Sequence, residues 1–193
     1  MKKNFILAAV IGLLAAVQVS AQESIFRKGD NVVSLGVGFA GNLYSGYSDG
    51  YGSFRQTPTF TLSYERCIID NLFNEQSSLG IGGLVGYSSA KKDYSSLVEV
   101  GWTSTDIVIG ARGALHYTFV EKFDTYAGVI MGYNINTWTE RVVGHSSSKT
   151  SDSSGMVYNT FVGGRYYLSD AFAAFAEFGY GYNTINVGLS LRF

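Results

Sequence analysis

Apolar and polar residues alternate at every second position along much of the chain, which is the period of a β-strand. The clearest case is residues 184–193, where five large apolar residues share one face: Ile185, Val187, Leu189, Leu191 and Phe193. Small or polar residues fill the positions between them. A large apolar face opposite a small polar face fits a strand that turns outward to lipid and inward to a narrow polar lumen.

Eight segments alternate in this way, and each has about the ten residues that a tilted barrel strand needs. They are residues 31–40, 57–67, 78–88, 104–119, 123–137, 156–168, 172–182 and 184–193. Long and short connections alternate between them. The pattern predicts an all-β protein, an eight-stranded antiparallel up-and-down transmembrane β-barrel.

The even number of strands places both chain ends on one side of the membrane. In exported barrels of this class the ends and the short turns are periplasmic, and the longer loops are outside. The predicted outside loops are residues 41–56, 89–103 and 138–155 and the turn at Asn183. Their Ser, Gly, Tyr and Asp content suits a solvated surface.

The first 21 residues have the three parts of a secretory signal peptide. Lys2 and Lys3 are followed by an apolar run and then by a small-residue cleavage pattern at residues 19–21. A membrane-spanning helix is the alternative, but the run is shorter than the roughly 20 apolar residues of a span. The mature barrel domain is therefore predicted to cover residues 22–193.

Composition agrees with an exported barrel and excludes one class of partner. Charged residues make up 15% of the chain, against about 25% in soluble domains. Removing Lys2 and Lys3 from the 14 Lys and Arg leaves 12 against 15 Asp and Glu, a net charge of −3 in place of −1. Without a basic excess, nucleic acid is not expected as a partner. Cys67 is the only cysteine, so no internal disulfide can form, and we expect it at a strand end.

The chain resembles the small eight-stranded outer-membrane β-barrel family, which includes OmpX and the membrane domain of OmpA. The resemblance covers roughly residues 31–193 and rests on strand number, alternating connection lengths, the stretch Gly163-Gly164-Arg165-Tyr166-Tyr167 and the terminal Phe193. It implies a monomeric barrel in the lipid of the Gram-negative outer membrane, with Phe193 as the signal that the β-barrel assembly machinery reads. A long first periplasmic turn, residues 68–77, and a very short fourth surface loop depart from the family pattern.

Several patterns that carry chemistry in other proteins have simpler explanations here. Residues 36–41 match G-x-G-x-x-G, but no helix follows, so lumen-facing glycines explain the match better than a dinucleotide site. His145 and Ser147 resemble the pair in outer-membrane lipid deacylases, yet both lie in a Ser-rich loop without an orienting carboxylate. Trp102 and Trp138 are interpreted as interfacial anchors. We expect no catalytic residue, metal site or cofactor.

Three hypotheses for function follow. The first is a non-enzymatic barrel that serves membrane integrity or contacts an extracellular partner, such as a host, through its surface loops. The second is a narrow porin-like conduit for small or hydrophobic solutes, and the third is a lipid-modifying enzyme. Because an eight-stranded barrel is about filled by its own side chains, the first is favoured.

The predicted lumen contains a network of paired charges. A three-residue turn at residues 169–171 places Glu177 opposite Gly163 and diagonal to Arg165. A two-residue turn after Tyr182 places Glu177 opposite Ser190 and diagonal to Arg192. The full predicted network is Glu65, Arg112, His116, Arg165, Glu177 and Arg192. For Arg192 the alternative is that its side chain reaches water at the periplasmic mouth.

Overall fold

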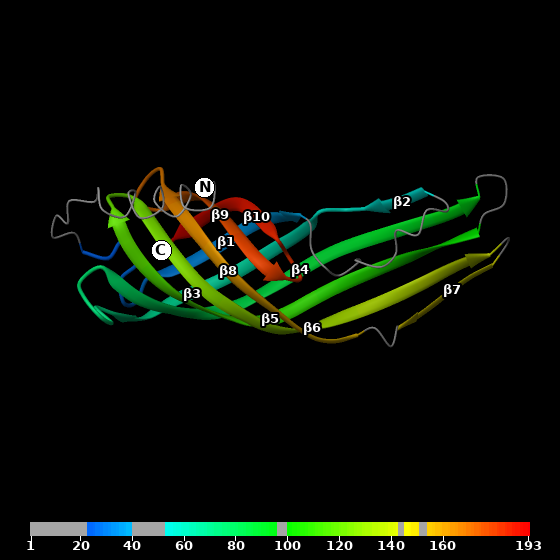
Figure 1. Ribbon diagram of the computed structural model, residues 1–193, viewed down its shortest axis with the longest axis horizontal. Helices are drawn as coiled ribbons and strands as arrows, with labels where there is room; N and C mark the ends of the chain where they lie inside the picture. The colour runs from blue at the N-terminus through cyan, green and yellow to red at the C-terminus, as the bar shows by residue number, and fades with distance from the viewer. Residues whose placement is uncertain (1–22, 40–52, 96–99, 143–144, 151–153) are drawn as a thin grey trace, which may run out of the picture.

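The computed structural model describes residues 23–39, 53–95, 100–142, 145–150 and 154–193, so the expected signal peptide lies outside the described residues. Ten strands form one antiparallel sheet that curls into a ring (Figure 1). Their bounds are β1 Asn31–Phe39, β2 Ser53–Gln56, β3 Thr59–Asp70, β4 Ser77–Ser95, β5 Val100–Val120, β6 Phe123–Val142, β7 His145–Thr150, β8 Gly155–Tyr167, β9 Phe172–Gly181 and β10 Ile185–Arg192. Within these ranges, no helix has the length and apolar character to span a membrane.

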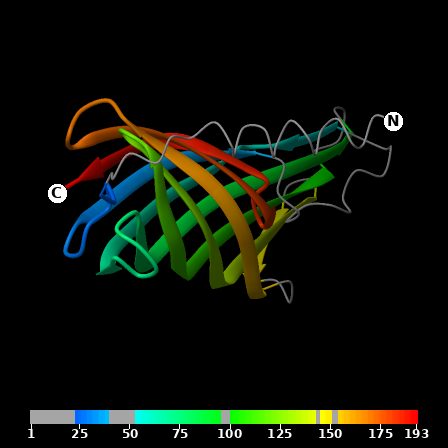
Figure 2. The same ribbon diagram turned by 60° about the vertical axis from the view of Figure 1, so that its left-hand side comes forward.

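Eight of these strands close the ring, in the order β1-β3-β4-β5-β6-β8-β9-β10. The last strand, β10, returns to pair with the first, β1, from Val32 with Arg192 to Phe39 with Ile185. Figure 2 shows the red β10 lying beside the blue β1. The prediction of an all-β, eight-stranded antiparallel up-and-down barrel is confirmed.

The two faces of the ring wall differ in the way that the alternation predicts. Outward side chains are large, apolar and exposed, as at Leu35 (64% exposed) and Met131 (63%). Exposed aromatic residues lie near both ends of the strands: Phe39, Tyr158 and Tyr180 at one end, and Phe119, Tyr166, Phe172 and Phe193 at the other. The wall therefore satisfies its own backbone hydrogen bonds and presents an apolar belt with aromatic borders.

Three strands, β4, β5 and β6, continue beyond the ring at the end away from Phe193 (Figure 1). There β2 pairs with the extension of β4, and β7 pairs with the extension of β6. The result is a five-stranded sheet in the order β2-β4-β5-β6-β7. We call this part, residues 53–56, 89–95, 100–105, 136–142 and 145–150, the projecting sheet.

The prediction of open loops at residues 89–103 and 138–155 is wrong for most of the described positions. Ser, Thr, Lys and Asp occupy both faces of these segments, so the alternation that marks a lipid-facing strand is lost. The backbone nevertheless stays in the ladder, because its donors and acceptors need partners. Residues 40–52, 96–99, 143–144 and 151–153 lie outside the described residues.

The two tryptophans of this region are not lipid-interface anchors. Trp102 is 4% exposed, and its ring stacks on that of Trp138 with the centroids 4.3 Å apart. Trp102 shares a strand face with buried Ser104, which pairs with Trp138. The alternation therefore turns both indoles to the inner side of the projecting sheet, and the prediction for them is wrong.

The connection between β9 and β10 also differs from the prediction. Ile185, the first residue of β10, pairs with Phe178 and not with Tyr182. Six residues, 179–184, therefore separate the paired positions, in place of the predicted two. Tyr182 and Asn183 fold inward and are 5% and 4% exposed. Glu177 consequently lies opposite Asn186 and not opposite Ser190.

A closed ring predicts heat-modifiable migration on a denaturing gel. The refolded, unboiled protein should run at a different apparent mass from the boiled one, because a wall without free edges resists detergent. A sample left in urea and never refolded is the control and should run with the boiled protein. Identical migration of boiled and unboiled refolded samples would contradict the closed ring.

Candidate functional site: the charged lumen

Five of the six predicted network residues lie together inside the ring. They are Glu65 on β3, Arg112 and His116 on β5, Arg165 on β8 and Glu177 on β9, and each is 1–7% exposed. Strand parity explains the arrangement, because each residue occupies an inward position on its strand. The cluster forms where these five positions reach the same level of the ring.

Arg112 and Glu177 form the first part of the cluster. Arg112 Nη2 donates to Glu177 Oε1 at 2.7 Å, and Tyr126 Oη donates to the same oxygen at 3.0 Å. Asn186 Nδ2 donates to the other carboxylate oxygen at 3.3 Å. The guanidinium also lies over Phe161, with Cζ 4.2 Å from the ring centroid, a favourable cation–π position. Glu177 therefore has partners for both oxygens.

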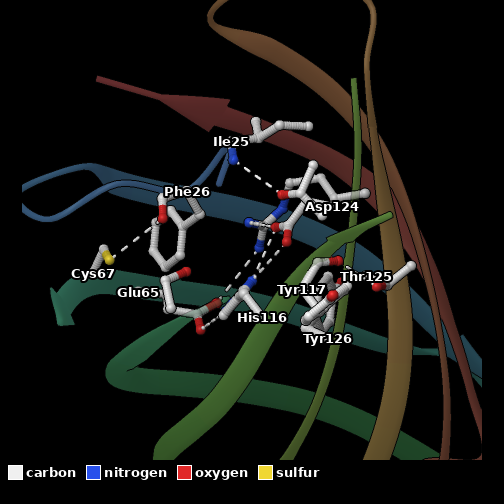
Figure 3. A network of polar contacts seen from close by, with 12 residues as sticks. Ile25, Phe26, Glu65, Cys67, His116, Tyr117, Asp124, Thr125 and Tyr126 are labelled. Carbon is white, nitrogen blue, oxygen red and sulfur yellow. Dashed lines mark hydrogen bonds and ion pairs between the residues drawn. The ribbon is translucent and has the colours of Figure 1, made fainter. Parts of the chain in front are cut away.

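His116 lies between two carboxylates in the second part (Figure 3). Its Nε2 is 2.7 Å from Glu65 Oε1, and its Nδ1 is 2.9 Å from Asp124 Oδ2. Arg165 joins the same carboxylates, with Nη1 3.2 Å from Asp124 and Nη2 3.5 Å from Glu65. The doubly protonated ring is the form that can donate to both neighbours. In that form, three cations face three carboxylates across the two parts.

The two parts are joined through Glu65. Arg112 Nε lies 3.4 Å from Glu65 Oε2, an ion-pair distance without hydrogen-bond geometry. Asp124 and Tyr126 were absent from the predicted network, although their positions on β6 are inward by the same alternation. The alternation of inward and outward positions could have identified both residues as inward. Their closeness to His116 and Glu177 depends on the curvature of the ring, which the sequence does not show.

Arg192 does not join the cluster. Its Nη1 donates to Ile25 O at 2.6 Å and lies 3.8 Å from Asp30 Oδ2, while Nη2 donates to Asp170 O at 2.6 Å. The prediction that it borders Glu177 is wrong, since Glu177 pairs with Asn186. Arg192 is instead partly exposed at the mouth of the ring beside Phe193, the alternative position proposed for it.

A short segment before β1 enters the ring at the same mouth (Figure 3). Phe26 is fully buried, with its ring centroid 4.6 Å from that of His116. Ile25 N donates to Thr118 Oγ1 at 3.0 Å. Cys67, predicted at a strand end, lies at a bulge within β3, buried against Phe26 and Val32. Residues 24–26 were not predicted inside the ring, because the segment carries no alternation.

The lumen has almost no free space above the cluster. A cavity of about 10 Å³ borders Arg112, Phe161 and Tyr182, which is room for about one water molecule. The glycine of the G-x-G-x-x-G match at Gly36 explains part of this packing. A Cβ there would lie 2.6 Å from Asn186 Oδ1 and 2.7 Å from Thr61 Oγ1. Glycine at this position therefore makes room for lumen side chains.

The remaining candidate residues of the sequence analysis lie outside the charged cluster. Within the described ranges, no group of three or more His, Cys, Asp and Glu side chains is arranged to hold a metal ion. His145 and Ser147 are in β7, but their side chains lie outside the described part of the chain. Phe193 is 66% exposed, and its backbone N and O each pair with Asn31 at 3.0 Å, continuing the β1–β10 seam.

Comparison with solved structures finds the same architecture. The structure of Ail, the attachment invasion locus protein of Yersinia pestis, in complex with the heparin analogue sucrose octasulfate is 13% identical in sequence and has a TM-score of 0.53. The match covers 86% of this chain and 100% of the Ail chain. A second Ail structure, 15% identical over the same shares, has a TM-score of 0.48. The chain has the fold of the eight-stranded outer-membrane β-barrels.

Sequence comparison adds no closer relationship, since no protein-family model and no curated protein matches the chain. The outer-membrane β-barrel fold is therefore recognised from the ring itself. Within this fold, the charged cluster is an internal structure. Its side chains are directed at one another, and the cavity that borders Arg112 and Glu177 has a volume of about 10 Å³.

The charged cluster predicts that Glu177→Ala destabilises the barrel by about 3–5 kcal/mol, the cost of removing one partner of a buried ion pair. The stranded partner is Arg112, which is 6% exposed. The measurement is equilibrium urea unfolding of the protein refolded into lipid vesicles, followed by tryptophan fluorescence.

The matched control is Glu121→Ala, which removes an exposed carboxylate from the turn between β5 and β6. It should change the free energy of unfolding by less than about 1 kcal/mol, the scale of exposed charges. A loss at Glu177 as small as the loss at Glu121 would contradict a buried, essential ion pair.

Proposed function

We propose that the protein is an integral outer-membrane protein that contacts an extracellular partner through its projecting sheet and has no enzymatic activity. One observation carries the proposal: a ring with an apolar outer belt and a filled interior extends at one end into a polar sheet. Among the described residues, the lumen cavity beside Arg112 has room for about one water molecule, so we assign the contact with a partner to the projecting end.

The fold supports the orientation that we propose for the barrel. The end that carries Phe193 and the start of β1 faces the periplasm, and the projecting sheet faces outside. Residues 1–21 act as a cleaved signal peptide for export, and residues 22–193 form the mature domain. Phe193 acts as the assembly signal, and the barrel is monomeric. The fold and the exposed aromatic Phe193 support these assignments.

The enzyme and the conduit are less well supported. A lipid-modifying enzyme needs a nucleophile, a base and an orienting group near the lipid boundary, whereas the His116 cluster lies inside the ring with carboxylates on both sides. A conduit needs a continuous path. Phe26 and the ion pairs fill the periplasmic half, and Tyr182 and Asn183 fold into the other half.

The side chains of the projecting sheet favour an anionic partner. Arg55 on β2 lies directly opposite Lys91 on β4, so two cations share one outward face. Like charges opposite each other destabilise a sheet unless an anion lies between them or near them. Asp93 Oδ2 is 3.0 Å from Lys91 Nζ and offsets one of the two charges. Ail has been solved with a sulfated heparin analogue, and we propose the same chemical class here.

Single-channel recording tests the filled lumen. The refolded wild-type protein should give no stable conductance in a planar bilayer, because the lumen cavity holds about one water molecule. A general porin refolded by the same procedure serves as the positive control. Regular conductance steps from the wild-type barrel would contradict the filled lumen and support the conduit.

Binding to sucrose octasulfate tests the projecting sheet. We expect the double variant Arg55→Gln, Lys91→Gln in lipid nanodiscs to bind about fivefold to thirtyfold more weakly, since each exposed charge contributes up to about 1 kcal/mol. Isothermal titration calorimetry at low salt gives the affinity. The matched control, Lys28→Gln with Lys122→Gln, removes two exposed cations at the opposite end. Equal weakening by both pairs would reject a site on the projecting sheet.

A further inference from the structure

The outer wall of the ring has a hollow across β3, β4, β5 and β6. Its volume is about 510 Å³, and its sides are formed by the exposed residues Tyr64, Ile81, Val129 and Met131. Ala111 and Gly113 on β5 form its floor. We call it the lipid-facing groove. It is continuous with the apolar belt that faces the membrane.

The hollow exists because Gly113 has no side chain. Gly113 faces outward between Ile81 on β4 and Val129 on β6. A Cβ built there would have its nearest heavy atom, Gly80 O, 4.0 Å away, so packing does not require glycine. Glycine weakens a strand interior, and the two residues paired with Gly113, Ile81 and Val129, are large and apolar. The groove is thus a feature of the outer surface and does not relieve a clash.

A cation stands at the rim of the groove. Arg66 lies on the outward face of β3, exposed, opposite Asn31 and Ile81 and near the end of the ring that carries Phe193. No hydrogen bond or ion pair links its side chain to another residue of the described ranges. An arginine on the lipid face of a barrel is tolerated near the interface, where a lipid phosphate can accept two parallel hydrogen bonds from the guanidinium.

We propose that the lipid-facing groove binds one glycerophospholipid of the periplasmic leaflet, with an acyl chain over Gly113 and Ala111 and its phosphate on Arg66. The inference rests on the proposed function only in that the barrel must lie in a membrane. The groove is apolar along its length and cationic at one rim, which matches the two parts of such a lipid. A second copy of the chain packed about a two-fold axis here would bring two Arg66 side chains toward each other.

Native mass spectrometry of the refolded barrel in neutral detergent tests this site, with phosphatidylglycerol added in increasing amounts. Wild type should retain one lipid under conditions that strip the others. Gly113→Leu fills the groove and should abolish the retained lipid. Arg66→Gln should weaken retention about fivefold, from the contribution of one basic residue at an anionic surface; Arg66→Lys should keep most of it.

The matched control is Ala174→Leu, which adds the same kind of side chain at an outward position on β9, outside the groove. It should leave retention unchanged. Retention by Gly113→Leu equal to that of wild type would overturn the proposal, and so would a dimer in place of the lipid adduct. Heat-modifiable migration is checked on every sample, so an unfolded wild type would count against the proposed function, and a folded wild type that retains no lipid would count against the groove alone.

Discussion

The charges buried in the lumen must be matched in number and in geometry, and the rest of the barrel depends on that match. An unpaired carboxylate or guanidinium inside the ring costs several kcal/mol, yet Glu65, Asp124, Glu177, Arg112 and Arg165 are all buried there. They come from β3, β5, β6, β8 and β9. A slip of any one of these strands by two residues would keep its apolar face toward lipid but would move its charge away from its partners. The cluster therefore selects one register among many that the apolar belt alone would accept.

The outer face of the ring constrains the choice of residue less strictly than the lumen does, and in the same way at every position. Leu35, Val129 and Met131 are all widely exposed, and any large apolar residue at these positions satisfies the requirement for contact with lipid. The inner face has no such freedom, since Gly36 must stay small beside Thr61 and Asn186. Specificity of the fold consequently resides on the inside, and the outside is free to carry local features such as the hollow at Gly113.

The sequence was sufficient where a connection was short and a strand was bordered by lipid. The three-residue turn at 169–171 correctly places Glu177 opposite Gly163, because a tight turn allows only one pairing register between its two strands. The next turn could not be counted in the same way. Tyr182 and Asn183 are polar or aromatic residues that look like the tip of a surface turn, yet they fold into the lumen, and the pairing moves from Ser190 to Asn186.

The alternation along a strand also cannot predict which side chains meet across the ring. Parity correctly turns Arg112 inward, but it cannot say that its partner is Glu177, since that contact depends on curvature and on which strands face each other. Phe26 gave no signal because it lies outside any alternating segment. The projecting sheet was missed for a different reason: Ser, Thr, Lys and Asp interrupt the apolar alternation in its sequence, although the backbone pairing of its strands continues.

The edge strands of the projecting sheet determine whether a partner could bind by adding a strand to it. Strands β2 and β7 border it, and their described lengths are four and six residues. Neither sequence contains the run of large apolar residues that promotes pairing with a foreign strand, and short, polar edges of this kind resist edge-to-edge association. Addition of a partner strand is therefore disfavoured at both edges. The broad face, where Arg55 lies opposite Lys91, is left as the surface through which side chains, and not backbone groups, would select an anionic partner.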